Sequence, residues 1–265
     1  MATEISGSSR PDYGIDAPAV IRNLFLVAAI GISTWVVTIL LSRSDVIRLP
    51  RPILILIGSG FSAGIVCALM GAWIIWESKV GKLRHRDRLL DRIEWRGDES
   101  VLDVGCGAGL LLIGAAKRLS SGKATGIDIW QSEDLTRNSR DVTLENARRE
   151  GVSDRVVIQT ADVRSLPFAD ATFDIVISRA AIHNIYSASE REKAIREIAR
   201  VLKPSGQAVI DDIRHFKQYS HVFSQNGCPD IRRAGSKWTY WFLTLLTFGS
   251  LRPATLLVRK SFRRR

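Results

Sequence analysis

Two long stretches without a charged residue constrain this chain more than any other feature of its sequence. Leu24–Leu41 holds 18 residues and Ile53–Trp76 holds 24. About 20 apolar residues in a helix suffice to cross the hydrocarbon core of a bilayer. Neither stretch has the polar face of a helix in a soluble core, and no small-residue cleavage site marks a signal peptide. We therefore expect a transmembrane hairpin over residues 21–78, with helices at about 24–41 and 53–76.

The second stretch contains a pair of glycines, Gly60 and Gly64, at the spacing that lets two helices approach closely. Packing of the two helices of one chain against each other is the simpler interpretation of this pair. A homodimer formed through the Gly60/Gly64 face is the alternative.

Positive charge is concentrated at two places, and the whole chain carries a formal net charge of +11. Seven Lys/Arg against three acids lie between Lys79 and Arg96, and eleven against one lie from Arg214 to the C-terminus. The first cluster directly follows the second apolar stretch, which places both termini and the remainder of the chain in the cytoplasm. Anionic lipid headgroups account for basic surface near a membrane, so nucleic acid is not an expected partner.

Beyond Trp95, short β-rich runs alternate with amphipathic helical runs. The expected strands are 100–105, 123–129, 155–163, 173–178 and 206–213, and the expected helices are 109–119, 139–150 and 189–202. Such alternation predicts a parallel sheet with right-handed crossovers, in which ligands bind at the carboxyl ends of the strands.

Local signals support two of these helices. Ser139 is a plausible N-cap for the second, and Gly151 follows its end. For the third, Ser189 and Glu192 have the spacing of a capping box, and Pro204 with Gly206 are expected to stop it.

A glycine cluster follows the first expected strand and opens the first expected helix. Gly105, Gly107 and Gly109 would let backbone N–H groups approach a nucleotide-like ligand. The third glycine comes one residue too early for G-x-G-x-x-G, and no Gly-Lys-Ser/Thr follows, which excludes a Walker loop. Asp128 and Asp162 end the next two strands, so three neighbouring strands carry glycines or carboxylates at one edge.

Four segments in this region, VLDVGCGAG, GIDIW, ADVRSLPFADATFDIVIS and REIARVLKPSGQAVIDDI, resemble the successive motifs of class I S-adenosylmethionine-dependent methyltransferases. The likeness is greatest to the group that contains the ubiquinone and menaquinone C-methyltransferases, and it covers about Val101–Ile213. It implies a Rossmann-like, doubly wound, mostly parallel seven-stranded α/β sheet and S-adenosyl-L-methionine as the cofactor.

The resemblance also assigns roles to the cofactor-site residues. Gly105, Gly107 and Gly109 would pass beneath the methionine part and ribose, and Asp103 would anchor the loop and the cofactor's amino group. The other expected members are Asp128 for the ribose, Ile129 for the adenine face, and Asp162 with the Val163 backbone for the adenine amine.

The residues after the fourth strand should overlook the transferred methyl group. His183 is the candidate general base and Asn184 a candidate substrate contact, whereas Tyr186 is expected to pack and Arg179 to contact the cofactor carboxylate or the sheet edge. The remaining histidines are expected to be ordinary surface residues: His85, His215 and His221.

No metal site is expected. The three cysteines, Cys67, Cys106 and Cys228, are isolated and form neither a disulfide framework nor a zinc motif. Two of them lie in the soluble part, too few for the arsenic methyltransferases that share the four motifs.

The C-terminal part departs from the family pattern. Residues 254–261 fit the last strand, but Trp238–Leu251 is unusually aromatic and apolar and too short for a span. An interfacial or buried segment and an edge strand with aromatic packing are both open for it.

The sequence thus predicts a membrane-anchored methyltransferase for a small or lipophilic acceptor. The expected parts are an N-terminal tail at 1–20, the hairpin at 21–78, a basic linker at 79–97 and the methyltransferase domain at 98–265. Alternatives are an enzyme for a small soluble or volatile acceptor such as a thiol, and a non-catalytic cofactor-binding scaffold. A nucleic-acid methyltransferase lacks support because no Asn/Asp-Pro-Pro-Tyr/Trp element follows the fourth strand.

Overall fold

The computed structural model describes residues 11–44, 49–131, 135–136, 138–235, 241, 244–245 and 252–262. By their contacts the residues group into two units. The sheet unit comprises Met1–Tyr13, Arg84–Trp130 and Asn138–Arg265, and the hairpin unit comprises Gly14–Leu83 and Gln131–Arg137. The N-terminal segment through Tyr13 therefore groups with the sheet, although it precedes the hairpin in the chain.

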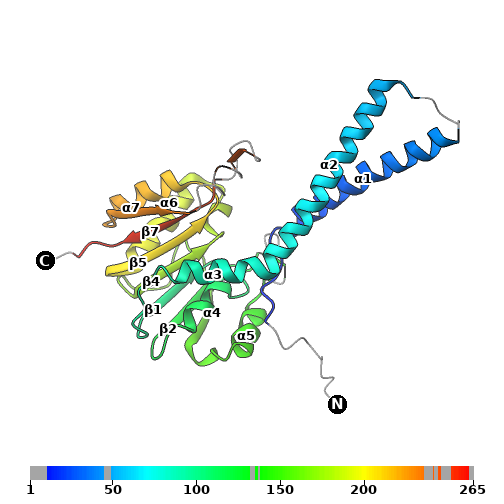
Figure 1. Ribbon diagram of the computed structural model, residues 1–265. Helices are drawn as coiled ribbons and strands as arrows, with labels where there is room; N and C mark the ends of the chain where they lie inside the picture. The colour runs from blue at the N-terminus through cyan, green and yellow to red at the C-terminus, as the bar shows by residue number, and fades with distance from the viewer. Residues whose placement is uncertain are drawn as a thin grey trace, which may run out of the picture. The chain divides into compact units, whose positions relative to one another are not determined.

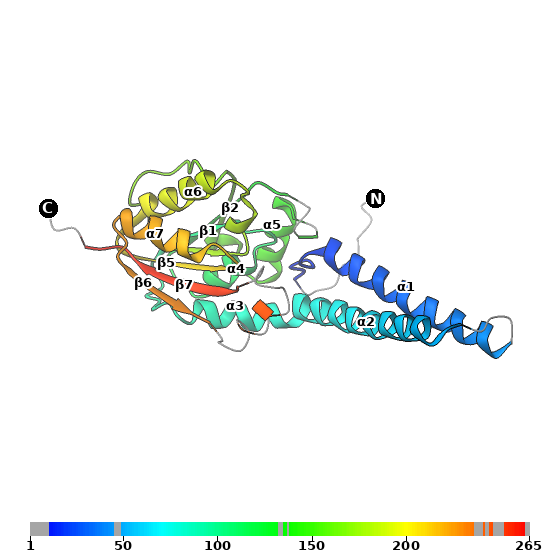
Figure 2. The same cartoon turned by 90° about the horizontal axis from the view of Figure 1, so that it is seen from above.

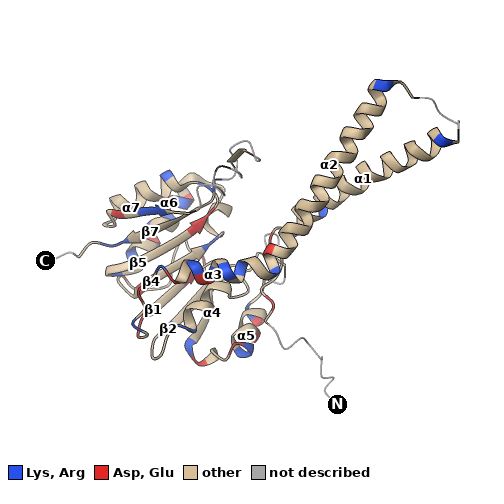
Figure 3. Ribbon diagram, in the orientation of Figure 1, with Lys and Arg blue, Asp and Glu red and all other residues tan. Residues whose placement is uncertain are grey.

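Two long helices, α1 (Pro18–Arg43) and α2 (Arg51–Trp76), make up most of the hairpin unit. Both are long and apolar enough to cross a membrane. Charged residues lie only near their ends (Figure 3). Large apolar side chains along them are exposed, including Ile30, Leu40, Ile55 and Leu69, which is unlike the core helices of a soluble protein.

Small residues lie where the two helices pack. A Cβ added at Gly31 of α1 would lie 2.5 Å from the carbonyl oxygen of Gly60, and one at Gly64 would lie 3.2 Å from that of Ala28. The rings of Trp35 and Phe61 stack with centroids 4.3 Å apart. Packing within the hairpin therefore uses the paired glycines, as the simpler interpretation predicted, while the homodimer stays a prediction.

The helix does not end with the apolar stretch. After α2 it passes through a π-helical turn, Glu77–Gly81, into α3 (Lys82–Leu90), which occupies much of the expected basic linker. From Arg84 on, α3 belongs to the sheet unit and packs on α4 (Leu110–Ala116). A Cβ at Gly114 of α4 would come within 2.7 Å of Leu90, so a small residue is needed at this contact.

Seven strands form one sheet in the order β3-β2-β1-β4-β5-β7-β6 (Figure 1). The first five strands along the chain are parallel, and β7 runs antiparallel to both β5 and β6. The strands are β1 Ser100–Val104, β2 Lys123–Asp128, β3 Val156–Thr160, β4 Phe173–Arg179, β5 Leu202–Asp212, β6 Asp230–Ala234 and β7 Ala254–Arg259. The predicted Rossmann-like seven-stranded fold is confirmed.

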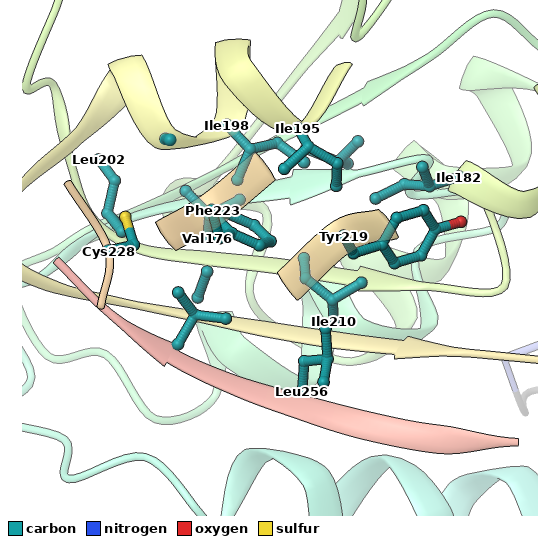
Figure 4. Packing of buried hydrophobic residues seen from close by; sticks show 14 of the residues in the cluster. Val176, Ile182, Ile195, Ile198, Leu202, Ile210, Tyr219, Phe223, Cys228 and Leu256 are labelled. Atoms are coloured by element: carbon teal, nitrogen blue, oxygen red, sulfur yellow. The ribbon is translucent and has the colours of Figure 1, made fainter. Parts of the chain in front are cut away.

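Helices cover both faces of the sheet. On one face lie α3, α4 and α5 (Arg140–Arg149), and on the other lie α6 (Ala188–Val201) and α7 (Phe216–Gln225), as Figure 2 shows from above. Buried side chains of α6 and α7 pack against the strands in a continuous apolar cluster (Figure 4): Ile195, Ile198, Tyr219 and Phe223 against Val176, Ile210 and Leu256. Each fully buried side chain of this kind contributes about 1.5–3 kcal/mol.

The alternation of side chains along each strand divides the polar residues between these faces. In β1, Leu102 and Val104 belong to the cluster beneath α6 and α7, so Asp103 points to the opposite face. In β5, Ile210 belongs to the same cluster, so Asp211 and Asp212 at the strand's end point to opposite faces.

The helix signals were correct for α5 and misplaced for α6. Ser139 caps α5 by accepting from the Val142 N–H, as predicted. The N-cap of α6 is Ser187, which accepts from the Glu190 N–H, and not Ser189. Both serines have an acid three residues later, and the chain leaves its extended conformation at the earlier one.

Two elements near the C-terminus were not predicted. α7 and β6 occupy 216–234, so the sixth strand forms before the aromatic segment rather than within it. β5 also starts earlier than predicted, at Leu202 directly after α6, and thus contains Pro204 and Gly206. Of Trp238–Leu251 only Trp241, Thr244 and Leu245 are described, and these are helical; the remainder lies outside the described residues.

Candidate active site

The glycine loop joins β1 to α4 in a conformation that other residues rarely adopt. Gly105, Gly107 and Gly109 have φ of +71°, +52° and +88°. A Cβ at Gly105 would overlap the Cβ of Ala181, and one at Gly109 would lie 2.8 Å from Thr143. Both the backbone and its crowded surroundings therefore require glycine here.

Hydrogen bonds fix this loop to the end of β2. The amides of Gly105 and Cys106 donate to the carbonyl oxygen of Ile127 at 2.9 and 3.0 Å. The Gly107 amide donates to Oδ2 of Asp128 at 2.8 Å, and the Trp130 amide donates to Oδ1 at 2.7 Å. A carboxylate has about four acceptor positions, so two remain at Asp128 for the paired hydroxyls of a ribose.

Asp103 is buried with an exposed fraction of only 1 %. In the described part of the chain, no group hydrogen-bonds to its Oδ2. Burial, and then the nearby charge of Asp128, raise the pKa of Asp103 to about 8. A buried acceptor without a donor is unfavourable, and an incoming ammonium group would both supply the donor and favour the ionised carboxylate. Asp103 thus fits the amino group of a methionine-like ligand.

The side chain next to Asp128 fits the base of a nucleoside. Ile129 is 49 % exposed, although it is apolar and follows a buried strand. Trp130 has φ of +60°, and its indole N–H donates to Oγ1 of Thr160 at 2.8 Å. Val163, also expected in this site, packs partly buried against the core. A flat ring laid on Ile129 would cover the exposed apolar surface.

Asp162 is engaged by a neighbour that the sequence did not reveal. The Arg164 Nε lies 2.9 Å from both carboxylate oxygens, and its backbone amide donates to Oδ1 at 2.9 Å. These contacts lower the pKa of Asp162. A hydrogen bond donated by an adenine amine to Asp162 stays a prediction, and the amine would share the carboxylate with Arg164.

His183 forms a close pair with the last residue of β5. Its Nδ1 lies 2.6 Å from Oδ1 of Asp212, a buried carboxylate. Oδ2 of Asp212 accepts from the His183 backbone amide at 3.1 Å and from the hydroxyl of Tyr219 at 3.2 Å. The contact is close, but the ring is not aligned for a hydrogen bond from Nδ1. A small rotation of the ring would direct an Nδ1–H at Asp212 and leave Nε2 as an acceptor. None of the described residues hydrogen-bonds to Nε2, so it can accept a proton.

Sequence reasoning missed two residues of this site: Asp212 as the partner of His183, and Tyr219 as a donor to Asp212. Two acids, Asp211 and Asp212, end β5, and no sequence motif indicates which one meets His183. Strand alternation could have separated them, because only the even-numbered positions of β5 share a face with Ile210.

On the opposite face, Asp211 has its own partners. His85 Nε2 lies 2.8 Å from Oδ2, the Thr255 hydroxyl donates to Oδ1 at 2.7 Å, and Arg179 Nε lies 3.9 Å away. The prediction that His85 is an ordinary surface residue is therefore wrong, because α3 packs on the sheet and carries His85 to the end of β5. Arg179 lies at the sheet edge, one of its two expected places.

A buried arginine of α6 stabilises the turn that follows β4. The buried Arg191 donates to the carbonyl oxygens of Ile185 and Tyr186 at 2.6 and 2.8 Å. Tyr186 itself is 98 % exposed, so the prediction that it packs is wrong. Asn184 ends the short 3-10 turn that contains His183.

The other predictions around the site concern His215 and metal binding. His215 precedes α7 with φ of +67°, and burial lowers its pKa, so it is not an ordinary surface histidine.

Within the described residues, no three His, Cys, Asp or Glu side chains are grouped as a metal site would need.

Known proteins share this domain. Residues 102–210 match the family model described as "Methyltransferase domain". The methyltransferase GfsG of Streptomyces halstedii is 35% identical over 49% of this chain and 43% of its own length. The ubiquinone/menaquinone C-methyltransferase UbiE of Roseobacter denitrificans is 29% identical over 60% of this chain and 62% of its own. This chain spans about half the length of the curated relatives it matches.

Solved structures share the fold. The [4+2]-cyclase SpnF superposes with a TM-score of 0.55 and 23% identity, over 68% of this chain and 81% of its own. YcgJ of Bacillus subtilis superposes with a TM-score of 0.51 and 20% identity, over 68% and 100%. At these identities the likeness establishes the architecture of the sheet unit.

Proposed function

Because the domain around residues 102–210 belongs to the class I S-adenosylmethionine-dependent methyltransferases, we propose that this chain is a membrane-anchored methyltransferase acting on a small or lipophilic acceptor. The cofactor of this domain is S-adenosylmethionine, whose sulfonium carries an activated methyl group. The observation that carries the proposal is the buried Asp103 without a donor on Oδ2, beside a loop that only glycines can form.

The residues of the sheet edge have separate roles in holding this cofactor. Gly105, Gly107 and Gly109 let the ligand approach the backbone, and Asp103 accepts from its amino group. The base end of the site is formed by Asp128 for the ribose hydroxyls, Ile129 for the adenine face, and Asp162 with Val163 for the adenine amine. The first two of these assignments are supported by the acceptor positions that remain at Asp128 and by the exposure of Ile129.

Methyl transfer needs a nucleophile held in line with the methyl group at about 3 Å and shielded from water. His183 is the proposed general base: Nε2 takes a proton from the acceptor while Nδ1–H stays directed at Asp212. The carboxylate of Asp212 then stabilises the imidazolium that forms. Asn184, in the same turn, is proposed to contact the acceptor.

Anchoring in a membrane is the second part of the proposal. α1 and α2 have the required length and apolarity, and basic residues follow α2 in the region expected to face the cytoplasm. A tethered site suits an acceptor that partitions into lipid. Two relatives carry names with lipophilic acceptors: demethylmenaquinone methyltransferase of Symbiobacterium thermophilum, 34% identical, and sterol 4-C-methyltransferase strm-1 of Caenorhabditis elegans, 28% identical.

A different activity on the same fold is the second candidate, because SpnF has this architecture and is described as a [4+2]-cyclase. This second candidate is a protein that binds the cofactor but does not transfer its methyl group. It includes both an enzyme with another activity and a non-catalytic scaffold.

The test uses the full chain purified in detergent and supplied with methyl-labelled S-adenosylmethionine and a membrane extract. Transfer of label to an extract component by the wild type, but not by Asp128→Ala, is the expected result. Binding of the cofactor without transfer to any component would favour the second candidate, and label on a water-soluble thiol would identify the soluble-acceptor alternative.

A further inference from the structure

The glycine loop is supported from the side opposite its bonds to β2. Two side chains on one buried face of α5 donate to successive carbonyl oxygens of the loop. Thr143 Oγ1 donates to the Gly107 carbonyl at 2.6 Å, and Asn146 Nδ2 donates to the Ala108 carbonyl at 2.9 Å. Asp128 holds the Gly107 N–H, in the preceding peptide unit, so three successive peptide units of the loop are each held by a side chain.

Asn146 has a second set of partners far away in the chain. Its Oδ1 accepts from the Asp12 amide at 2.9 Å, and its Nδ2 donates to the Asp12 carbonyl at 2.8 Å. The side-chain amide thus pairs with one residue's backbone much as a neighbouring strand would. Both Nδ2 hydrogens are used, one on Asp12 and one on Ala108, and Asn146 is only 2 % exposed.

The next residue anchors the segment in the sheet unit. Tyr13 is buried, and its hydroxyl donates to Oε1 of Glu150, one turn beyond Asn146 on α5. Burial raises the pKa of the Tyr13 hydroxyl, which therefore stays protonated and donating. Asp12 is thus held to the sheet unit through its backbone, and Tyr13 through its buried side chain. Both residues lie in the stretch that the sequence predicted to be an N-terminal tail.

We infer that Asn146 is a positioning residue for the cofactor, and that the Asp12–Tyr13 segment is the part of the fold that orients it. The paired bonds to Asp12 allow one orientation of the Asn146 amide, with Nδ2 toward the glycine loop. Without the two bonds to Asp12, only the bond to the Ala108 carbonyl would hold the Asn146 amide, which could then rotate away from the loop. The loop would then lose one of its two hydrogen bonds from α5. The part of the loop that contacts the cofactor would change conformation as a result.

This inference rests on the proposed function, and it also predicts a reciprocal effect. If the segment favours the loop conformation that binds the cofactor, the cofactor must stabilise the segment by the same free energy. Amide hydrogen exchange at residues 12–15 should therefore slow when S-adenosylhomocysteine binds.

The test measures S-adenosylhomocysteine binding by calorimetry on the full chain in detergent, with both the dissociation constant and the bound fraction as readouts. Asn146→Leu, the isosteric Asn146→Asp and Asp12→Pro should each weaken binding about tenfold with the bound fraction unchanged. Ala147→Gly is the matched control, because it weakens α5 and leaves both sets of Asn146 bonds in place; its dissociation constant should equal that of the wild type.

A merely structural role would lower the bound fraction and leave the dissociation constant of the folded protein unchanged. Equal dissociation constants in the wild type and all three variants would overturn this inference and leave the proposed function standing. Ligand-independent exchange at residues 12–15 would overturn it as well. A wild-type chain that binds neither S-adenosylmethionine nor its demethylated product would refute the proposed function itself and, with it, this inference.

Discussion

At the scale of single residues, the chemistry depends on which nitrogen of His183 is held. Asp212 lies 2.6 Å from Nδ1, and its other bonds come from the His183 amide, the Tyr219 hydroxyl and the Ile213 amide. Three donors thus hold this buried carboxylate in place beside Nδ1 of His183. It therefore orients the ring more rigidly than a solvent-exposed acid could.

His183→Gln should lower the rate of methyl transfer by about 10²–10⁴-fold if the acceptor must lose a proton in the reaction. The dissociation constant of S-adenosylhomocysteine should stay the same, because no cofactor contact is removed. Asp212→Asn should lower the rate as well, since an amide can present its N–H to Nδ1 and favour the wrong tautomer. An unchanged rate in both variants would show that the acceptor needs no base.

Asp103 should make cofactor binding depend on pH. In the free protein its raised pKa of about 8 keeps the carboxyl protonated at lower pH. A bound ammonium favours the ionised form, so the pKa falls on binding and a proton is released. Affinity for S-adenosylhomocysteine should therefore increase as pH rises toward about 8 and level off above it.

Calorimetry in two buffers of different ionisation enthalpy would measure the proton released, and Asp103→Asn is the control because it cannot titrate. The variant should bind more weakly and with no proton release. Equal proton release from the wild type and Asp103→Asn would assign the titration to another group.

At the scale of secondary-structure elements, the start of α6 provides a test with a built-in control. Ser187 and Ser189 are both followed three residues later by an acid, but only Ser187 accepts a backbone N–H. Ser187→Ala should lower the free energy of unfolding by about 1 kcal/mol, whereas Ser189→Ala should change it by a few tenths at most. Urea denaturation of the two variants would measure this difference, and a larger effect at Ser189 would contradict the cap assignment.

The elements also show why the sheet edge is polar on both faces. Asp103 and Asp211 point to the face of α3 and α4, where His85 and Arg179 meet Asp211, and Asp212 points to the face of α6 and α7. One strand end thus supplies one acid to the proposed catalytic pair and another to a contact with α3.

At the scale of the whole molecule, the hairpin predicts a defined topology. Ser42, near the end of α1, and Ser121, before β2, are both exposed. In intact cells a membrane-impermeant maleimide should label Ser42→Cys, and it should label Ser121→Cys only after the membrane is permeabilised. Replacing the native Cys67 by alanine removes background labelling from α2. Labelling of Ser121→Cys in intact cells would reverse the proposed orientation.

The sequence by itself determined the two apolar helices, the alternating sheet and the edge at which the cofactor is proposed to lie. These follow from local composition and from periodicity, because apolar runs, capping residues and glycines at strand ends act through nearby chain. It also made Asp103, Asp128 and His183 candidates for the site, and their roles in cofactor binding and catalysis stay predictions.

Only the tertiary structure decided which distant side chains meet. The pairing of His183 with Asp212 and of Asn146 with Asp12 depends on how helices and strands pack. The local turn after β3 decides that Arg164 folds back onto Asp162. β6 was missed because its five residues are mostly charged and show no apolar alternation. α7 was overlooked although Phe216, Tyr219, Val222 and Phe223 have helical spacing. Asn146 and Asp12 are separated by 134 residues and become neighbours only when the chain packs. A local sequence pattern cannot predict such a contact.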